Sequence, residues 1–417
     1  MNIVHLSHTD SGAGAGHAAY RLHKSILKLG INSSMLVADK RTDDPTVSGL
    51  NRSIFSRTRL YEWLESRHSR LLARTPHSLF SPARFVQYNP ASHPNVLSAD
   101  VVTLYWINGG FISPETITHI AKPLVWRLSD IWPFSGGCHY PGDCEGYTKY
   151  CGNCPQVKHP SEDDFSRRLW KRKFNAWQNI NFTITAPSSW MAKLARQSSL
   201  FKDCRIEVIP TGVDLALFRP LDKPSIRERL GIPTDSLVIA FSSLDPNGDR
   251  RKGYFELSVV LQCIASSSLS NRVMALIFGR EKLSHEFLPI ETRYLGRLGQ
   301  DQNLVDAYSV ADVVVVPSIE DNLPNVALEA IACGTPVCAF EVGGMADIIR
   351  DAWNGFLSPV SDSVALAENL ISILSNEDLR RQMAKNARAH AERVFSLDLQ
   401  ASSYIKLYAE LKGKRVQ

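Results

Sequence analysis

The sequence predicts an α/β protein of two domains, each built on a doubly wound parallel sheet. The chain has 417 residues, enough for two domains of about 200 residues each. Short apolar segments alternate with amphipathic stretches, as they do when parallel strands are connected by helices. A turn-rich stretch over residues 210–224 divides this alternation into two series. We therefore expect a first domain over residues 1–210 and a second over residues 211–385.

The first series begins with a strand at residues 3–6, followed by a glycine loop and an amphipathic stretch at 17–29 ahead of Gly30. The other strands expected in this domain lie at residues 34–37, 101–105, 124–127, 182–186 and 206–209. The segment 51–94 interrupts the alternation, and we interpret it as an insertion of basic helices.

The second series contains the clearest strand–turn–helix unit of the chain. Residues 313–316 are consecutive valines, which favours a buried parallel strand. Pro317 and Ser318 end this strand, and Asn325 opens an apolar helix that stops at Gly334. Further strands are expected at 237–242, 273–278, 293–294 and 337–340, and residues 379–413 are expected to be nearly all helical.

The composition is that of an ordinary globular protein, with 44% hydrophobic and 21% charged residues. No stretch approaches the roughly 20 apolar residues that a membrane span needs. The N-terminus lacks the basic region and the long apolar core of a signal peptide. We therefore expect a cytoplasmic protein whose eight cysteines are mostly reduced.

The net charge of +5 is unevenly distributed. Residues 51–85 contain seven arginines against two acids, Glu62 and Glu65. A second basic run at 167–173 is interleaved with aromatic and aliphatic residues at helical spacing. Both segments fit solvated helix faces, and both fit attraction to anionic lipid headgroups or to a diphosphate-linked acceptor. No nucleic-acid-binding motif accompanies the charge, so we expect no nucleic-acid partner.

Two carboxylates lie eight positions apart in the strand–turn–helix unit: Asp321 in the loop and Glu329 inside the helix. In an open α/β sheet, ligands bind at the carboxyl ends of the strands. Carboxylates at that edge can accept hydrogen bonds from the hydroxyls of a ribose or a sugar. Either residue alone also fits an ordinary surface acid.

The whole string from Val313 to Val337 resembles the donor-binding motif of family-4 retaining glycosyltransferases with the GT-B fold, in which two acids are separated by seven residues. Asp321 stands where most members have Glu, and Asp-Asn-Leu-Pro-Asn stands where many have Glu-Gly-Phe-Gly. This variant, and the string Trp-Pro-Phe-Ser-Gly-Gly-Cys-His-Tyr at 132–140, resemble the branch that builds colanic acid, O antigen and other bacterial surface polysaccharides.

The resemblance implies two Rossmann-like domains that face a cleft holding the donor, with the C-terminal helices, residues 386–417, crossing back to the first domain. It assigns ribose hydroxyls to Glu329 and the donor sugar to Asp321. The other residues of the motif that it places at the donor are Asn322, Leu323, Pro324 and Asn325. Gly343 and Gly344 match the glycine pair of the family beside the donor.

A basic loop, Asp-Arg-Arg-Lys-Gly at 249–253, follows the first strand of the second series. An ammonium beside a guanidinium suits a leaving diphosphate, whose developing charge must be neutralised, although a solvated loop would look the same. In the family an Arg and a Lys from this loop hold the donor diphosphate. Lys252 matches the Lys, and either Arg250 or Arg251 is the Arg.

A glycine-rich loop at residues 11–16 lies between the first strand and the first helix. Glycines allow close approach of the backbone, and a helix N-terminus favours phosphate. The loop could also serve a dinucleotide, as in a dehydrogenase, but the spacing does not complete GxGxxG and no acid follows the second strand convincingly. In the family this loop covers the donor phosphates, a role that Gly14 and Gly16 inherit.

No triad for nucleophilic catalysis is visible in the sequence. This fits the resemblance, because these retaining enzymes are thought to rely on positioning and charge stabilisation. Many relatives have a His before the acid at Asp130, where this chain has Ser129. Asp130 is a candidate for orienting donor or acceptor hydroxyls, or else a turn cap. No metal is expected in catalysis, because the basic loop takes the place of a bound cation.

Half of the cysteines fall within 17 residues: Cys138, Cys144, Cys151 and Cys154. Four sulfurs with one Cys-x-x-Cys pair can close a tetrahedral structural zinc site. Disulfides or reduced core cysteines are the alternatives, and His139 could replace one ligand. The remaining four cysteines lie in apolar contexts and fit the core.

The sequence thus predicts a glycosyltransferase that lies on the inner face of a bacterial membrane. It would move a sugar, with retention, from a nucleotide diphosphate sugar to a growing lipid-diphosphate-linked glycan. Two alternatives remain: a sugar-nucleotide epimerase of the same fold, and an inactive sugar-nucleotide-binding subunit, which the departures at Asp321 and Ser129 admit.

Overall fold

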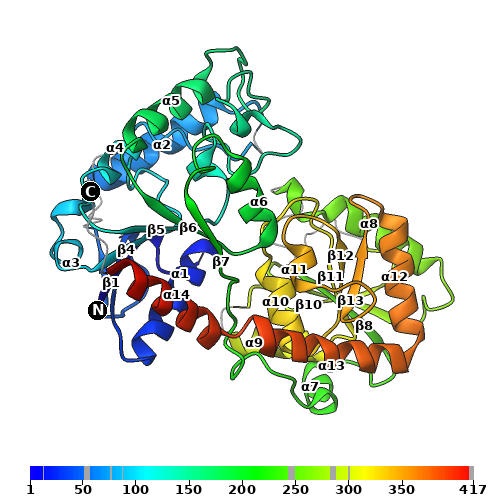
Figure 1. The fold of residues 1–417 in the computed structure, drawn as a ribbon. Helices are drawn as coiled ribbons and strands as arrows, with labels where there is room; N and C mark the ends of the chain where they lie inside the picture. Colours follow the sequence, from blue (N-terminus) through cyan, green and yellow to red (C-terminus); the bar gives the residue numbers. More distant parts are fainter. Residues whose placement is uncertain are drawn as a thin grey trace. The chain divides into compact units, whose positions relative to one another are not determined.

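The computed structural model describes residues 1–12, 14–50, 57–75, 78–86, 88–242, 249–281, 288–298 and 301–412. The chain divides into two compact units (Figure 1). The first consists of Met1–Thr211 with Asp398–Gln417, and the second of Gly212–Leu397. Each unit is an α/β domain with its own parallel sheet, as predicted.

The first unit contains a seven-stranded parallel sheet of order β3-β2-β1-β4-β5-β6-β7. Its strands are β1 (Asn2–Thr9), β2 (Asn32–Asp39), β3 (Val47–Gly49), β4 (Val101–Leu104), β5 (Leu124–Arg127), β6 (Phe182–Ala186) and β7 (Arg205–Val208). The strand order reverses between β1 and β4. In open α/β sheets such a switch point is where ligands bind, beyond the carboxyl ends of the strands.

The helices of the first unit are α1 (Gly14–Lys28), α2 (Arg57–Leu72), α3 (Pro94–Leu97), α4 (Pro114–Ile117), α5 (Phe165–Trp177), α6 (Ser189–Gln197) and α14 (Leu397–Lys412), with short 3-10 turns η1 (Pro90–Ser92), η2 (Trp132–Phe134) and η3 (Gly146–Thr148). In the described part of the predicted basic insertion, one long helix, α2, replaces the several that we expected before residue 94. Residues 51–56 of that insertion, and Gly413 of the predicted helical tail, lie outside the described residues.

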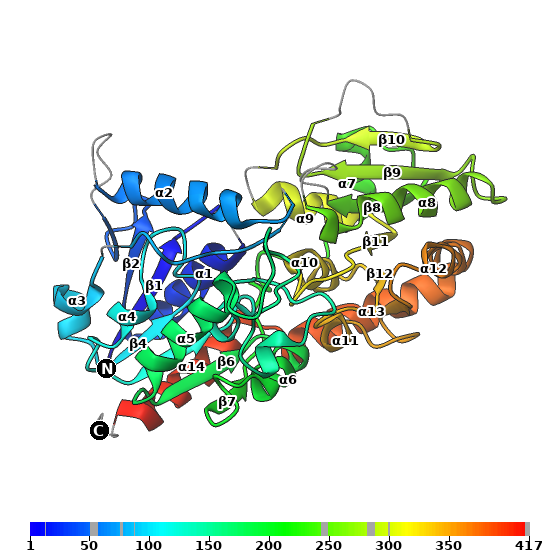
Figure 2. The same cartoon turned by 90° about the horizontal axis from the view of Figure 1, so that it is seen from above.

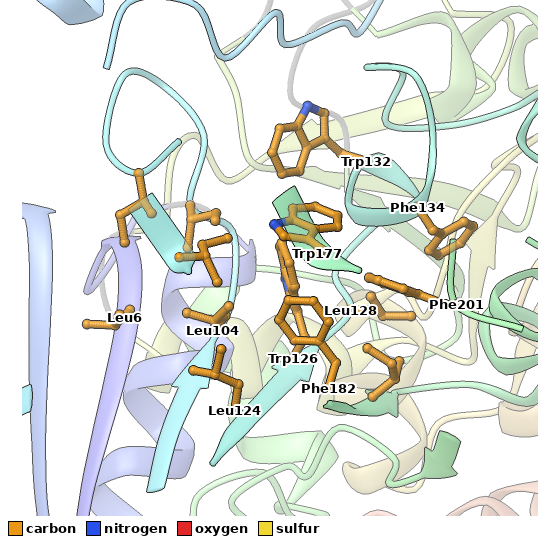
Figure 3. Packing of buried hydrophobic residues seen from close by; sticks show 14 of the residues in the cluster. Leu6, Leu104, Leu124, Trp126, Leu128, Trp132, Phe134, Trp177, Phe182 and Phe201 are labelled. Atoms are coloured by element: carbon orange, nitrogen blue, oxygen red, sulfur yellow. The ribbon is translucent and has the colours of Figure 1, made fainter. Parts of the chain in front are cut away.

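Aromatic side chains fill the core beneath β5 and β6 (Figure 3). The Trp126 ring on β5 lies 5.3 Å from that of Trp177 and 5.5 Å from that of Phe182. Trp132 and Phe134, which follow β5, are also buried in this cluster. Because large aromatic rings contribute strongly to burial, the cluster fixes the path of the chain just after β5, where Asp130 lies.

The last helix, α14, packs on the first sheet. The hydroxyl of Tyr408 pairs with Thr103 Oγ1 of β4 at 2.7 Å, and that of Tyr404 with Thr185 Oγ1 of β6 at 2.8 Å. The tail joins the first unit at Asp398 rather than at residue 386. Residues 386–394 belong instead to α13, which packs in the core of the second unit through Ala387 and Ala391.

The second unit contains a six-stranded parallel sheet of order β10-β9-β8-β11-β12-β13, and Figure 2 shows this order from β10 to β12. Its strands are β8 (Leu237–Ser242), β9 (Val273–Phe278), β10 (Glu291–Tyr294), β11 (Val313–Val316), β12 (Val337–Phe340) and β13 (Gly355–Ser358). Its helices are α7 (Lys223–Leu230), α8 (Tyr254–Ala265), α9 (Asp301–Val310), α10 (Asn325–Ala332), α11 (Met345–Ile348), α12 (Ser363–Ser375) and α13 (Glu377–Val394), with the 3-10 turn η4 (Arg250–Lys252).

The switch point of the second sheet lies between β8 and β11. The predicted basic loop follows β8, and the predicted acidic loop follows β11. The fold therefore brings both loops to the edge where ligands bind. Among the described residues, none of the helices has both the length and the apolar character required to cross a membrane.

Candidate active site

The two residues predicted to act on the donor form an ion pair at the β8/β11 switch point. Lys252 Nζ donates to Asp321 Oδ2 at 2.6 Å. The Asp321 carboxylate is buried, and its Oδ1 accepts a hydrogen bond from the backbone N–H of Asn322 at 2.9 Å. The Lys252 side chain is 41% exposed. The pair thus presents a solvent-accessible ammonium backed by a fixed carboxylate.

Glycines allow the loops around this pair to touch main chain to main chain. Gly253 has φ +74°, and a Cβ there would collide with the carbonyl oxygen of Pro317 at the end of β11. Gly343 has φ +53°, and a Cβ there would collide with the carbonyl oxygen of Asp321. Gly344 N–H donates to Asn322 O at 2.7 Å. Both residues of the predicted glycine pair therefore contact the acidic loop directly, and at Gly343 only glycine permits this approach.

The two arginines of the basic loop have different partners. Arg250 Nη1 donates to Glu256 Oε2 of α8 at 2.7 Å, and this hydrogen bond raises the pKa of Arg250. Arg251 Nη2 donates to Asp249 Oδ2 at 2.7 Å. The Glu256 side chain is 8% exposed and that of Asp249 is 38% exposed. Separating Arg250 from its partner would leave a buried carboxylate unpaired, so Arg251 is the better candidate for a diphosphate.

Glu329 lies in α10 and is 6% exposed. Its Oε2 accepts a hydrogen bond from the hydroxyl of the fully buried Tyr308 at 3.1 Å. Of the neighbouring motif residues, Asn322, Leu323 and Pro324 are buried and Asn325 is half-buried at the first turn of α10. The ribose contact of Glu329 stays a prediction, and Tyr308 holds one of its oxygens in place.

Gly14 and Gly16 belong to the first unit, whereas the other predicted donor residues belong to the second. Gly14 is exposed and begins α1. Gly16 is buried, and a Cβ there would lie 2.6 Å from the carbonyl oxygen of Thr9. Close packing of α1 against the end of β1 therefore accounts for Gly16, and the phosphate contact predicted for both glycines stays a prediction.

Asp130 is the acid of a hydrogen-bonded Asp–His–Ser chain that sequence reasoning missed. His139 Nδ1 lies 2.6 Å from Asp130 Oδ2, and His139 Nε2 lies 2.8 Å from Ser81 Oγ. Asp130 Oδ1 also caps the turn, accepting from Trp132 N–H at 2.9 Å. Both ring nitrogens of His139 are engaged in hydrogen bonds, and the alternative in which His139 replaces a cysteine as a metal ligand stays a prediction. Ser81 lies 58 positions before His139, so no spacing pattern signals the set.

The four clustered cysteines surround one small cavity of about 20 Å³. All eight cysteines are free. Gly136 N–H points to Cys151 Sγ at 3.1 Å, and burial raises the pKa of the Cys151 thiol to about 12. In the arrangement that the structure gives to the described residues, no group of three or more His, Cys, Asp or Glu side chains could hold a metal ion. Zinc at Cys138, Cys144, Cys151 and Cys154 therefore stays a prediction.

The basic run at 167–173 is only partly on the surface. Lys173 is fully buried, with Nζ donating to Ser135 O at 3.0 Å and lying 3.6 Å above the Trp132 ring. Burial lowers its pKa to about 7. Arg172 pairs with Glu115 at 2.8 Å. The expectation that the whole run forms a charged surface is therefore wrong for Lys173.

Comparison with known proteins identifies the class of the second unit. Residues 222–390 match the family model described as Glycosyl transferases group 1. This region contains the Lys252–Asp321 pair, Glu329 and the glycine pair. The class of enzyme domain predicted from the sequence, a glycosyltransferase, is thus confirmed for this part of the chain.

Among curated proteins, the chain is 33% identical over 223 residues to a D-inositol 3-phosphate glycosyltransferase of Saccharomonospora viridis, covering 49% of this chain and 50% of that protein. It is 34% identical over 221 residues to the enzyme of that name from Xylanimonas cellulosilytica, covering 51% and 52%. The chain thus spans about half the length of the curated relatives it matches.

Solved structures match over both units. Sucrose-phosphate synthase from Thermosynechococcus elongatus has a TM-score of 0.66 at 18% identity, covering 99% of each chain. Anabaena HepE in complex with UDP and glucose has a TM-score of 0.65 at 16% identity, covering 99% of this chain and all of that one. At these identities the likeness concerns the fold, and it confirms the predicted GT-B fold with two Rossmann-like domains.

Proposed function

We propose that this chain is a retaining glycosyltransferase that moves a sugar from a nucleotide diphosphate sugar to a hydroxyl of a growing, lipid-diphosphate-linked glycan. The observation that carries the proposal is the Lys252–Asp321 ion pair at the β8/β11 switch point. It lies within the region that matches group-1 glycosyltransferases, and glycines hold the loops around it in direct contact.

The ion pair explains how donor binding and bond cleavage would be coupled. In transfer, the acceptor oxygen forms a bond to the anomeric carbon while the bond from that carbon to the diphosphate breaks. The electron pair of the broken bond leaves with the diphosphate, which takes up the proton of the acceptor hydroxyl. Lys252 is exposed enough to move from Asp321 to the diphosphate, with Arg251 as the second cation. Asp321 would then accept hydrogen bonds from hydroxyls of the donor sugar, and Glu329 from the ribose.

Features of helix α2 in the first unit support the proposed type of acceptor. Helix α2 exposes Leu60 by 53%, Trp63 by 57% and Leu71 by 61%. Arg67 and Arg70 line a surface hollow of about 310 Å³ together with Trp63 and Leu71. Exposed apolar side chains beside arginines are typical of helices that lie in a membrane interface. This supports a peripheral enzyme on an anionic membrane surface, with a lipid-linked acceptor of the surface-polysaccharide type.

The first experiment should be a thermal-shift screen with UDP, GDP, ADP and their sugars, because a ligand that binds only the folded state raises the apparent stability. The sugar nucleotide selected in this way is then supplied, radiolabelled, with a bacterial lipid extract or with soluble phosphorylated polyols. Label in the lipid fraction is the expected result. Label in the polyol alone would replace the acceptor by one like that in the names of the curated relatives.

The same assay separates the alternatives. An epimerase of this fold would change the sugar nucleotide without any acceptor. An inactive binding subunit would show a thermal shift and no turnover. If no sugar nucleotide gives either a thermal shift or turnover, the proposed function is refuted.

A further inference from the structure

The first unit has its own switch point, and a polar and aromatic cluster lies beside it. His8 lies near the end of β1, and its N–H donates to the carbonyl oxygen of Trp106, just after β4, at 2.8 Å. The His8 and Trp106 rings meet edge to face at 5.3 Å, and the Trp106 and His139 rings lie 5.9 Å apart. The Asp130–His139–Ser81 chain therefore adjoins the edge of the sheet where ligands bind.

The hydrogen bonds among Asp130, His139 and Ser81 determine which atom donates and which accepts. An ionised carboxylate can only accept, so His139 Nδ1 donates to Asp130 at 2.6 Å. His139 Nε2 then accepts from the hydroxyl of Ser81 at 2.8 Å. Trp106 Nε1–H approaches the same Nδ1 from 3.4 Å, but a protonated Nδ1 cannot accept, so in this arrangement Trp106 makes no hydrogen bond to His139. Because the Ser81 proton is used, the free lone pairs of Ser81 Oγ can accept a hydrogen bond from a ligand hydroxyl.

The backbone around the chain is held rigidly on both sides. Ser81 N–H donates to Gly137 O at 2.9 Å, and His139 N–H donates to Leu79 O at 3.0 Å. Ile131 N–H donates to His139 O at 3.0 Å. Two segments that are distant in the sequence, 79–81 and 131–139, are thereby joined beside one hydroxyl. Such support from the second layer of residues is what a binding group needs to be preorganised.

The three residues of this hydrogen-bond network differ in solvent exposure. Asp130 and His139 are buried, whereas Ser81 is half-buried. Ser81 is therefore the least buried of the three residues. His139 brings an imidazole to Asp130 from the cysteine-containing loop.

We infer that Ser81 Oγ binds a hydroxyl of the sugar acceptor, and that His139 and Asp130 are positioning residues that hold Ser81 as a hydrogen-bond acceptor. The inference rests on the proposed function, and it names the group in the first unit that recognises the acceptor. A sugar hydroxyl is the chemistry that fits, because the half-buried oxygen requires a neutral donor and aromatic side chains lie beside it.

The test uses the full chain with the sugar nucleotide found by thermal shift and a panel of octyl glycosides as acceptors. Ser81→Ala should raise the KM for the glycoside about tenfold, the usual consequence of losing one hydrogen bond, and leave the donor KM and the Tm unchanged. Ser81→Thr, which keeps the hydroxyl, should restore much of the affinity. Ser78→Ala, in the same segment, is the matched control and should behave as wild type.

His139→Asn and Asp130→Asn test the positioning role. Both should raise the glycoside KM as Ser81→Ala does. The proton shared by His139 and Asp130 should give a strongly deshielded NMR resonance in the wild type and in Ser81→Ala, and none in the other two variants. Absence of that resonance from the wild type would overturn the inference.

The remaining outcomes separate this inference from the proposed function. A wild-type glycoside KM in Ser81→Ala, or a parallel change in donor KM, glycoside KM and Tm, would show that the chain only fastens loops. A wild-type enzyme that turns over the donor but accepts no glycoside of the panel would overturn the assignment of a sugar hydroxyl to Ser81. Failure to turn over any sugar nucleotide, even with water, would refute the proposed function itself.

Discussion

At the scale of single residues, the ion pair between Lys252 and Asp321 combines two requirements that oppose each other. The Lys252 ammonium must be able to reach a diphosphate, yet in the free enzyme its side chain must be held in one conformation. A buried carboxylate at 2.6 Å holds it in place. Because the Lys252 side chain is 41% exposed, the pair is worth little as a stabilising contact, and its place at a switch point accounts for it better.

The first prediction separates charge stabilisation from ground-state binding. Lys252→Ala should lower kcat more than it weakens donor binding, because the cation matters most as charge develops on the leaving diphosphate. Glu329→Ala should instead weaken donor binding by about 1–3 kcal/mol, because buried hydroxyl partners lose their acceptor. Steady-state kinetics and nucleotide titration distinguish the two effects.

Lys385→Ala is the matched control for Lys252, since Lys385 is an exposed lysine of α13 in the same unit. It should have wild-type kinetics. Wild-type values in both Lys252→Ala and Glu329→Ala would remove the donor from the second unit.

The second prediction concerns pH and the buried His23 of α1. Its ring nitrogens contact Ser33 Oγ at 2.7 Å and Thr46 Oγ1 at 2.8 Å, and burial lowers its pKa from 6.5 to about 4. Between pH 6.5 and about pH 4, His23 is therefore protonated in the unfolded chain but neutral in the folded chain. Stability is full above pH 6.5 and falls as the pH drops toward 4, by about 2 kcal/mol at pH 5.

Urea unfolding of the wild type and of His23→Gln at pH 7.5 and pH 5 measures this. Gln keeps polar atoms near the two hydroxyls but does not titrate, so the variant should lose less stability on acidification. An equal loss in both proteins would assign the pH dependence to other groups, among them His5, whose pKa burial also lowers.

At the scale of elements, the physical character of each strand decides how well the sequence predicts it. Residues 237–242, 273–278, 313–316 and 337–340 coincide with β8, β9, β11 and β12, because central parallel strands are buried on both faces and read as continuous apolar runs. The edge strands β3 and β13 were missed. Each is short and pairs on one side only, so its sequence carries little pattern.

The candidate site divides in the same way. Lys252, Asp321 and Gly343 lie in loops directly after strands, and motif and strand order were enough to bring them together. The Ser81–His139–Asp130 chain depends on how long irregular segments fold over the carboxyl ends of the strands, which neither periodicity nor spacing reports. The ion-pair partners of Arg250 and Arg251 could not be predicted from the sequence either, because these adjacent residues of one turn pair with different acids.

The third prediction belongs to the loop 138–154. We expect about one zinc ion per chain, bound by Cys138, Cys144, Cys151 and Cys154, because four thiolates fill a tetrahedral site and leave no open position for chemistry. The four residues already line one cavity of about 20 Å³, which is room for a single small occupant. The sulfurs would close around the ion on binding, and the metal would fasten the loop that carries His139.

Metal analysis of purified protein, together with titration of native thiols, checks this. Cys151→Ser should lose the zinc and lower the Tm, whereas Cys263→Ser, outside the cluster, should do neither. Substoichiometric zinc with four freely titrating thiols in the native wild type would count decisively against the site and would favour reduced core cysteines.

At the scale of the whole molecule, the two units differ in which kind of comparison matches them. The family model covers residues 222–390, inside the unit with the ion pair, whereas the solved structures match over 99% of the chain at low identity. Helix α2, the cysteine loop and the Ser81–His139–Asp130 hydrogen-bond network all lie in the first unit.

The last prediction is reversible, salt-sensitive binding of the whole protein to anionic membranes through α2. Each basic residue near an anionic surface contributes roughly 1 kcal/mol, and salt screens this attraction. The exposed Trp63 and Leu71 add an apolar component that salt does not remove. The protein should therefore sediment with phosphatidylglycerol vesicles at low salt and leave them in large part at high salt.

Two variants separate these components. Arg67→Gln with Arg70→Gln should abolish the salt-sensitive part, and Trp63→Ser with Leu71→Ser should abolish the part that persists at high salt. Leu399→Ser, at a solvent-exposed leucine on α14, should change neither. If the wild type ignores anionic vesicles even at low salt, the arginines of α2 form only a solvated face, and a soluble acceptor replaces the lipid-linked one.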